Sequence, residues 1–370
     1  MKKNAIFVIL FFVVLAGFAI ATFLLPAREF SDNENRNLAQ MPVLSVDTLL
    51  SGEFQSGLSD FLSDQIPGRE FWIRLNTGFK KLMGKTEING VWLGDDGYYF
   101  QVFTDDSYST SRTQAIFALI NQFAGKLENK VTIMPVPTPG CVLSDKLPKN
   151  APIYDDYTVW QALKAATPNC VFIDLEERFI KLRENHTFYY RTDHHWTAEG
   201  AYFAYTLWCE NHGLQVRTPE EFGITTVSDS FLGTIYSKTL DAAAQPEEIK
   251  APQNLPKVTV TVDEKTTLDS VYAEEFLSKK DQYAYFFGGN YGKVEITTEA
   301  TGGKTLVVIK DSFANSFVPY LLYDYERIIM LDLRYFNGVI LQEIPADAEV
   351  LFLYEMTNLL TDTGINKLAR

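Results

Sequence analysis

The chain has 370 residues, of which 46% are hydrophobic, and its formal net charge is −14. This length fits one large α/β domain with accessory segments, and the hydrophobic content is enough for a folded core. A surface this acidic repels phosphate backbones, which argues against nucleic acid as a partner.

The N-terminus contains a long apolar run. Ala5–Leu25 carries no charge and is about as long as a helix that crosses a bilayer. The positive-inside rule keeps Lys2 and Lys3 in the cytoplasm and places the chain after Pro26 outside. No clean A-x-A cleavage site follows, although GFAIA leaves open a cleaved and secreted form. We therefore predict that residues 1–26 anchor an extracytoplasmic domain in the membrane, at the cell surface or on the periplasmic side.

A polar linker and two amphipathic stretches follow the anchor. Residues 27–42, AREFSDNENRNLAQMP, are predicted to be a juxtamembrane linker. Apolar residues recur at helical spacing in FQSGLSDFLSDQIP and again in FWIRLNTGFKKLMG, so both are predicted to be helices. Linker and helices together make up residues 27–84. The next stretch, GVWLGDDGYYF, has two apolar runs joined at Asp95–Gly97 and is predicted to be a hairpin.

The rest of the chain alternates between helical patterns and apolar strands. Helical patterns lie near residues 111–128, 155–166 and 198–211. The apolar strands are at 131–137, 170–175, 305–311, 327–333 and 349–354. Uninterrupted apolar strands separated by helices indicate an α/β fold, with a parallel sheet covered on both faces. We assign this domain to residues 85–370, with a small β-rich insertion at about 215–300.

Functional groups in such sheets gather beyond the carboxyl ends of the strands, and Ser312 follows the strand TLVVIK. A serine on the turn from a strand into a helix lies beside unpaired backbone N–H groups and the positive end of a helix dipole. Those groups suit an oxyanion, and hence an acyl-transfer nucleophile. An ordinary helix cap is the alternative, because Asp and Ser are favoured there.

The stretch RTDHHWTAEG holds two of the four histidines. Thr197 is a natural N-cap for the following helix, so the preceding residues form a loop. In an extended loop, Asp193 and His195 point to the same side, and the carboxylate can bond the imidazole. That is the base half of a Ser-His-Asp triad. His194 would point the other way into a structural hydrogen bond, and Trp196 would pack under the loop.

A metal site is the other interpretation of the paired histidines. Zinc would need a third ligand, yet His186 and His212 give no helical H-x-x-x-H pattern. The Asp-rich motifs of manganese phosphoesterases are also missing, so neither a metal nor a cofactor is predicted. Cys141, Cys170 and Cys209 contain no C-x-x-C pair; they allow one disulfide but no disulfide framework.

Several motifs occur together in one order: TDHHWT, FLGTIYSKTL, DQYAYFFGGNYG, VVIKDSFANSFVP and LDLRYF. NENRNLAQMPVLS, SGEFQSGLSDFLSDQIPGR and VWLGDDGYYF precede them. On these motifs the chain resembles the DHHW protein family over nearly its whole length after the anchor. More distantly, it resembles the SGNH-hydrolase-like O-acetyltransferases of alginate modification, which move acetyl groups onto exported polysaccharide. That resemblance implies a three-layer, flavodoxin-like sheet.

The resemblance also implies roles for single residues. Asp193 would orient His195, His195 would be the base, and Ser312 would be the nucleophile. The serine lies in KDSF, whereas ordinary SGNH enzymes have GDS, so Lys310 replaces a glycine near the oxyanion.

Other polar residues are candidates for the oxyanion or the substrate. Gly289 and Asn290 in FFGGN would supply oxyanion donors or form a plain turn. Arg334 follows the strand RIIMLDL and would bind a substrate carboxylate or phosphate, or pair with Asp332.

We therefore predict an anchored serine O-acetyltransferase that modifies a cell-envelope or exported polysaccharide through an acyl-serine, without metal or cofactor. Acetyl-CoA does not exist outside the membrane, so the resemblance implies a membrane-bound O-acyltransferase as the acetyl donor. Two alternatives stay open. A carbohydrate esterase would use the same triad with water as acceptor, and a non-catalytic subunit would bind or scaffold glycan.

Overall fold

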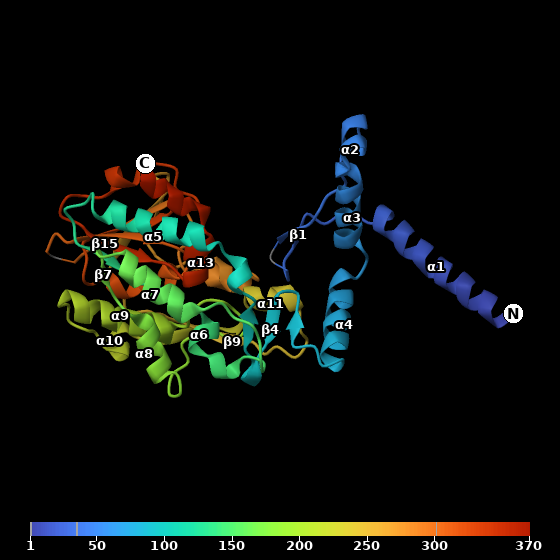
Figure 1. The fold of residues 1–370 in the computed structure, drawn as a ribbon, viewed down its shortest axis with the longest axis horizontal. Coiled ribbons are helices and arrows are strands. Elements are labelled where there is room, and N and C mark those ends of the chain that lie inside the picture. The colour runs from blue at the N-terminus through green and yellow to red at the C-terminus, as the bar shows by residue number, and fades with distance from the viewer. Residues whose placement is uncertain (1, 35, 301) are drawn as a thin grey trace. The chain divides into compact units, whose positions relative to one another are not determined.

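The computed structural model describes residues 2–34, 36–300 and 302–370. The chain divides into two compact units (Figure 1). The first comprises residues 1–89 and 236–244, and the second comprises residues 90–235 and 245–370.

The first unit is mainly helical. Its helices are α1 (Lys2–Leu24), α2 (Val46–Ser51), α3 (Glu53–Gln65) and α4 (Arg69–Leu82), with short strands β1 (Phe30–Ser31), β2 (Arg36–Asn37) and β3 (Glu87–Ile88). The two amphipathic helices predicted from the sequence are confirmed as α3 and α4. Within α1, Ile6–Leu24 is long and apolar enough to cross a membrane, and by length and composition it fits a signal-anchor or a signal peptide.

A mixed sheet of eight strands forms the centre of the second unit. The strand order is β11-β10-β12-β14-β13-β15-β6-β7. The strands are β6 (Val131–Ile133), β7 (Val171–Phe172), β10 (Val258–Val262), β11 (Thr266–Leu268), β12 (Lys293–Thr298), β13 (Thr305–Lys310), β14 (Arg327–Asp332) and β15 (Glu349–Leu353). Strands β14, β13, β15, β6 and β7 run parallel, so their carboxyl ends share one edge.

The prediction of a wholly parallel sheet is wrong in one respect. Strands β12, β10 and β11 are antiparallel and extend the sheet beyond β14. They come from residues 215–300, where the sequence suggested an insertion. On β10, Val260 and Val262 are buried while Thr259 is exposed, so this alternating strand can pair at the sheet edge with one face toward solvent. Strands β8 (Ile224–Phe231) and β9 (Glu247–Pro252) form a separate ribbon.

Each face of the sheet carries its own hydrophobic cluster, because successive strand residues point to opposite sides. On β13, Leu306 and Val308 belong to one cluster, and Val307 and Ile309 belong to the other. Helices α8 (Leu175–Leu182) and α9 (Ala198–His212) contribute to the first cluster. Helices α5 (Thr110–Ala124), α7 (Asp156–Ala166) and α13 (Met356–Thr361) contribute to the second (Figure 1).

The remaining strands and α-helices are short. They are β4 (Val91–Leu93), β5 (Tyr99–Gln101), α6 (Pro139–Val142), α10 (Pro219–Phe222), α11 (Thr234–Thr239) and α12 (Ala314–Phe317). Strands β4 and β5 pair antiparallel, which confirms the predicted hairpin. The hairpin turn contains Asp96 at a φ of 54° and Gly97 at 79°, a backbone conformation that suits Asp and Gly.

Candidate active site

Asp193 and His195 contact each other in the loop before α9. Oδ1 of Asp193 accepts the backbone N–H of His195 at 2.9 Å and lies 2.6 Å from its Nδ1. Residues 191–195 are a series of bends, so the predicted extended conformation is wrong. An aspartate that accepts the N–H two residues further on closes a local turn. The turn, rather than a strand-like alternation, brings the carboxylate to the imidazole.

The second carboxylate oxygen of Asp193 is bonded from another part of the chain. Oδ2 accepts the backbone N–H of Thr234 at 2.7 Å and its hydroxyl at 2.9 Å. Burial would raise the pKa of the Asp193 carboxyl, but His194, His195 and the Thr234 hydrogen bond hold it well below its usual range. Asp193 is therefore ionised at neutral pH although only 1% of it is exposed.

Ser312 completes a chain of hydrogen bonds. Its Oγ lies 2.8 Å from Nε2 of His195, on the opposite side of the ring from Asp193. His195 and Ser312 are 4% and 7% exposed. The structure thus brings Ser312 to Asp193 and His195, from which it is separated by more than a hundred residues, and the order is carboxylate, imidazole, hydroxyl.

Asp311, and not Ser312, holds the turn between β13 and α12. Its Oδ1 accepts the N–H of Phe313 at 3.0 Å, and its Oδ2 accepts the N–H of Glu355 at 2.8 Å. Among the residues that the structure describes, none caps α12 with a side chain. The helix-cap alternative for Ser312 is therefore wrong, because its hydroxyl faces His195.

Aromatic side chains fix the imidazole and the loop. Tyr283 stacks on His195 with ring centroids 3.7 Å apart and an interplanar angle of 9°. Its hydroxyl lies 2.9 Å from Oγ of Ser316, which also accepts Nε1 of the fully buried Trp196 at 2.8 Å. His194 bonds the hydroxyl of Thr234 through Nδ1 at 2.7 Å. The predicted packing of Trp196 is present. His194 forms a hydrogen bond, but the prediction that it points away is wrong, because its ring lies 3.9 Å from the ring of His195.

Lys310 links the turn to the FFGGN segment. Its Nζ donates to Oδ1 of Asn290 at 3.1 Å and to Oδ1 of Asn315 at 2.7 Å. Asn315 in turn donates to the carbonyl of Gly289 at 3.4 Å. Burial lowers the pKa of the Lys310 amine to about 8, although Asp332 favours its charged form. Gly289 and Asn290 are thus tied to residues on either side of Ser312.

The backbone N–H groups of Ser312 and Asn290 are among those near this turn that have no acceptor in the described part of the chain. Arg334, by contrast, is engaged: its Nε and Nη2 donate to the two oxygens of Asp332 at 2.9 and 2.6 Å. Of the two roles expected for Arg334, the structure has the pair with Asp332.

Comparisons with known proteins agree with this fold. The sequence matches the family described as DHHW protein over residues 88–331, about two thirds of the chain. The chain belongs to the DHHW protein family. Among curated proteins, no sequence matches it.

Solved structures similar to this DHHW protein include three of bacterial origin. A DHHW family protein from Eubacterium siraeum has 24% identity and a TM-score of 0.65, over 76% of this chain and 96% of that one. Bacillus cereus PatB1, solved with a sulfonyl adduct, has 22% identity and a TM-score of 0.61, over 74% and 97%. The O-acetyltransferase domain of Pseudomonas putida AlgJ has 16% identity and a TM-score of 0.49, over 76% and 99%. The first two similarities establish a shared fold.

The DHH segment of this DHHW protein also offers metal-ligand atoms. One atom each from Asp193, His194 and His195 lies within 4.8 Å of the others. However, both ring nitrogens of His195 already face Asp193 and Ser312, and Nδ1 of His194 faces Thr234. A metal here would have to replace these hydrogen bonds, so the geometry favours the triad.

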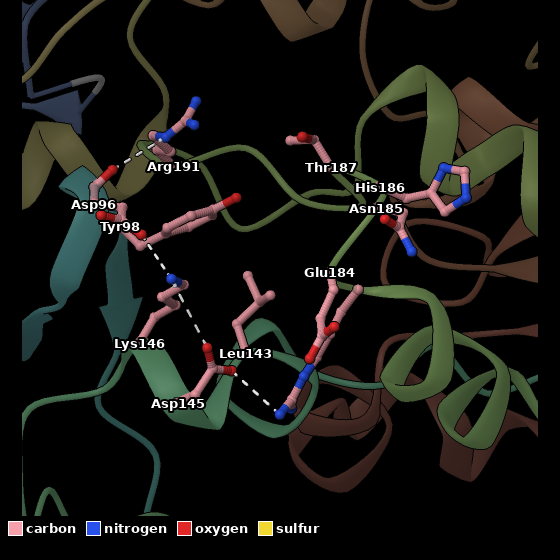
Figure 2. Close-up of a pocket in the computed structure, with 11 residues that line it drawn as sticks. Asp96, Tyr98, Leu143, Asp145, Lys146, Glu184, Asn185, His186, Thr187 and Arg191 are labelled. Atoms are coloured by element: carbon pink, nitrogen blue, oxygen red, sulfur yellow. Dashed lines mark hydrogen bonds and ion pairs between the residues drawn. The ribbon is translucent and has the colours of Figure 1, made fainter.

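A polar hollow of about 860 Å³ lies beside the segment that leads into the triad loop (Figure 2). Lys146 pairs with Asp96 at 2.6 Å and lies 3.8 Å from Asp145, and Arg191 donates to the backbone carbonyl of Asp96. The residues lining it do not include Ser312, His195 or Asp193. Its charges pair mainly with each other, so we assign it no part in the chemistry.

Sequence analysis missed several residues that shape the site. Thr234 bonds Asp193, Tyr283 stacks on His195, and Asp311 holds the serine turn. Only glycine fits at position 233, because a Cβ there would overlap the side chain of Asp193. Gly233 and Thr234 lie in FLGTIYSKTL and Tyr283 lies in DQYAYFFGGNYG, so the family motifs were the available signal.

Proposed function

We propose that this DHHW protein is a serine O-acetyltransferase that modifies a cell-envelope or exported polysaccharide outside the cytoplasm. The continuous hydrogen-bond chain from the ionised Asp193 through His195 to Ser312 carries the proposal. A serine hydroxyl is a weak nucleophile by itself and needs an adjacent base, which a third group orients. Both requirements are met by buried side chains at hydrogen-bond distance.

In the first half-reaction, Nε2 of His195 takes the proton of Ser312 while Oγ attacks the acetyl carbonyl of the donor. The bond between the acetyl carbon and the donor oxygen then breaks, and His195 returns the proton to the leaving oxygen. Asp193 accepts the Nδ1–H throughout and stabilises the imidazolium. The product is an acetyl ester on Ser312.

In the second half-reaction, a sugar hydroxyl gives its proton to His195 and attacks the acetyl-serine. The ester bond to Oγ breaks, Ser312 regains the proton, and the acetylated sugar leaves. Water in place of the sugar would make the same steps an esterase. The N–H groups of Ser312 and Asn290, which have no acceptor among the described residues, are our candidates for the oxyanion donors. Gly289 and Lys310 would hold Asn290 in position.

The chain organisation fits this proposal. Residues 1–26 would act as a signal-anchor, residues 27–84 would be the juxtamembrane segment, and residues 85–370 would form a three-layer SGNH-hydrolase-like domain outside. A membrane-bound O-acyltransferase would supply acetyl groups, because the compartment lacks acetyl-CoA. No step above needs a metal or a cofactor.

Intact-protein mass spectrometry tests the nucleophile. The full-length chain in detergent would be incubated with an activated acetyl ester beside Ser312→Ala, His195→Ala and the exposed-serine control Ser111→Ala. We expect one acetyl group on the parent and on Ser111→Ala, and none on the other two. A sulfonyl fluoride should label the same forms. A folded parent without any adduct or released acetate would favour a non-catalytic glycan-binding subunit.

The acceptor is tested separately. The acetylated protein would be mixed with cell-envelope oligosaccharides, and both sugar esters and free acetate would be measured. Acetylated sugar that exceeds the buffer control supports the transferase. Free acetate without acetylated sugar would identify an esterase.

A further inference from the structure

One thiol and two carboxylates outside the triad meet beyond the carboxyl ends of β6 and β7. Cys141 belongs to α6, Asp156 is the first residue of α7, and Glu176 is the second residue of α8. Their Sγ atom and one carboxylate oxygen from each acid all lie within 4.8 Å of one another. We call these residues the Cys141 cluster.

The carboxylates of the cluster are buried and incompletely bonded. Asp156 and Glu176 are 6% and 8% exposed. Oδ2 of Asp156 and Oε2 of Glu176 are buried without a hydrogen-bond partner among the described residues. Buried polar atoms in native proteins are nearly always bonded, so two such oxygens in one place call for an explanation.

Apart from the Cys141 thiol, which interacts with both acids, the described neighbours leave one oxygen of each carboxylate without a donor. Tyr154 donates its hydroxyl to Oδ1 of Asp156 and leaves Oδ2 unsatisfied. In the described part of the chain, neither carboxylate of the cluster forms an ion pair with a lysine or arginine.

The helix N-termini do not account for the carboxylates either. Asp155 caps α7 by accepting the N–H of Thr158 at 3.0 Å, and Asp174 caps α8 by accepting the N–H of Glu177 at 3.2 Å. The capping role is therefore already filled by the aspartates that precede each helix. Asp156 and Glu176 instead meet the thiol.

We propose that Cys141, Asp156 and Glu176 bind a divalent transition-metal ion, with Zn²⁺ as the best fit. One sulfur and two carboxylate oxygens are ligand types that zinc accepts, and three protein ligands leave a fourth position for water. A thiolate disfavours Mg²⁺ and Ca²⁺, which prefer oxygen ligands alone. The ion would neutralise two of the three negative charges, and the thiol proton would go to solvent on binding.

Bound metal would join α6, α7 and α8, which border the last two strands of the sheet. The inference does not depend on the chemistry of Ser312.

Cobalt binding tests the site in the full-length chain in detergent, with thiols kept reduced and metals first removed by a chelator. We expect Co²⁺ to produce thiolate-to-cobalt absorption that saturates at one ion per chain and disappears when Zn²⁺ is added. Cys141→Ser should abolish the absorption, whereas Cys170→Ser and Cys209→Ser should retain it, because those free thiols lie outside the cluster. Zn²⁺ should raise the Tm of the parent and not of Cys141→Ser.

Glu176→Gln provides a second variant of nearly the same shape. It should weaken Co²⁺ binding about tenfold or more while circular dichroism shows a folded protein. A folded parent without thiolate-to-cobalt absorption would overturn the proposal. So would absorption retained in Cys141→Ser, or an unchanged affinity in Glu176→Gln.

Discussion

The triad and the Cys141 cluster lie beyond the carboxyl ends of parallel strands in the same mixed sheet, and the carboxylates of both are buried. They differ in how their polar atoms are satisfied. Both oxygens of Asp193 accept hydrogen bonds, one from His195 and the other from Thr234. In the Cys141 cluster, Asp156 and Glu176 each keep one oxygen to which no described residue donates.

This difference separates two uses of buried polar groups. A fully bonded network has one favourable arrangement, so the reacting atoms are in place before the substrate arrives. An incompletely bonded group has lost its water without gaining a replacement. We infer that the first group is built for chemistry by its own residues, and that the second needs a ligand from outside.

The largest effect should come from Asp193→Asn, which changes the most completely bonded group. The amide NH2 would replace one of the two oxygens and face the donors of either His195 or Thr234, so the side chain would no longer accept from both and fix the imidazole tautomer. We expect kcat for acetyl transfer to fall about 10⁴-fold with little change in KM. The exposed Asp229→Asn serves as the control. Activity near that of the parent would show that the fully bonded carboxylate of Asp193 is not needed for acetyl transfer.

Lys310→Met tests a buried amine that forms hydrogen bonds but whose charged form is disfavoured by burial. The Lys310 pKa falls from 10.5 to about 8 on folding, chiefly through burial, so between these pH values the unfolded chain binds more protons. Parent stability should therefore rise with pH in this window, by on the order of 3 kcal/mol relative to Lys310→Met. Denaturant unfolding at pH 8 and pH 10 measures the difference. Exposed Lys279→Met should track the parent, and parallel curves for Lys310→Met would contradict the assignment.

Gly233→Ala tests whether the carboxylate of Asp193 tolerates displacement. The added methyl group would overlap that side chain and shift it from His195 and Thr234. A displacement of about 1 Å at an active site can cost about 10²-fold in rate, and we expect a loss of that order with the fold retained. At Gly78 an added Cβ meets nothing within 4 Å, so Gly78→Ala is the matched control. Equal rates for both variants would count against a precise site.

The smallest effect is expected for Trp196→Phe. It removes the donor that bonds the carbonyl of Phe313 at 3.1 Å and Oγ of Ser316 at 2.8 Å. Ser316 keeps its contact with the Tyr283 hydroxyl, but the carbonyl of Phe313 loses this donor, which should cost about 1–3 kcal/mol in denaturant unfolding, with a smaller change in rate. Trp72→Phe loses a bond to Pro67 that is exposed, and should cost less. Equal costs would show that burial does not decide the value of such bonds.

The sequence predicted those parts of the fold and site that depend on local pattern. Continuous apolar strands predicted the parallel core, and the strand rule directed attention to the residue after TLVVIK, which is Ser312. Asp193 and His195 are two residues apart, so their contact needed only a loop. Even there, the extended conformation was wrong, because the backbone N–H of His195 also bonds the carboxylate.

The remainder depends on tertiary contacts that no local pattern encodes. Thr234 reaches Asp193 from 41 residues away, and Tyr283 reaches His195 from the strand-poor stretch before β12. The antiparallel strands of residues 215–300 have patterns typical of any half-buried strand, so their place in the main sheet was not predictable. The Cys141 cluster likewise joins three helices, and none of its members belongs to a spaced metal motif.

The stacking of Tyr283 on His195 has a stereochemical consequence. The His195 ring has Tyr283 stacked at 3.7 Å and the His194 ring 3.9 Å away, so its edge is what is left for an incoming molecule. We expect the acceptor to approach Nε2 from one side alone, so that attack on the acyl group creates a tetrahedral carbon of a single handedness. Selection among the hydroxyls of a sugar would then begin with the direction of approach, before any group on the sugar is recognised.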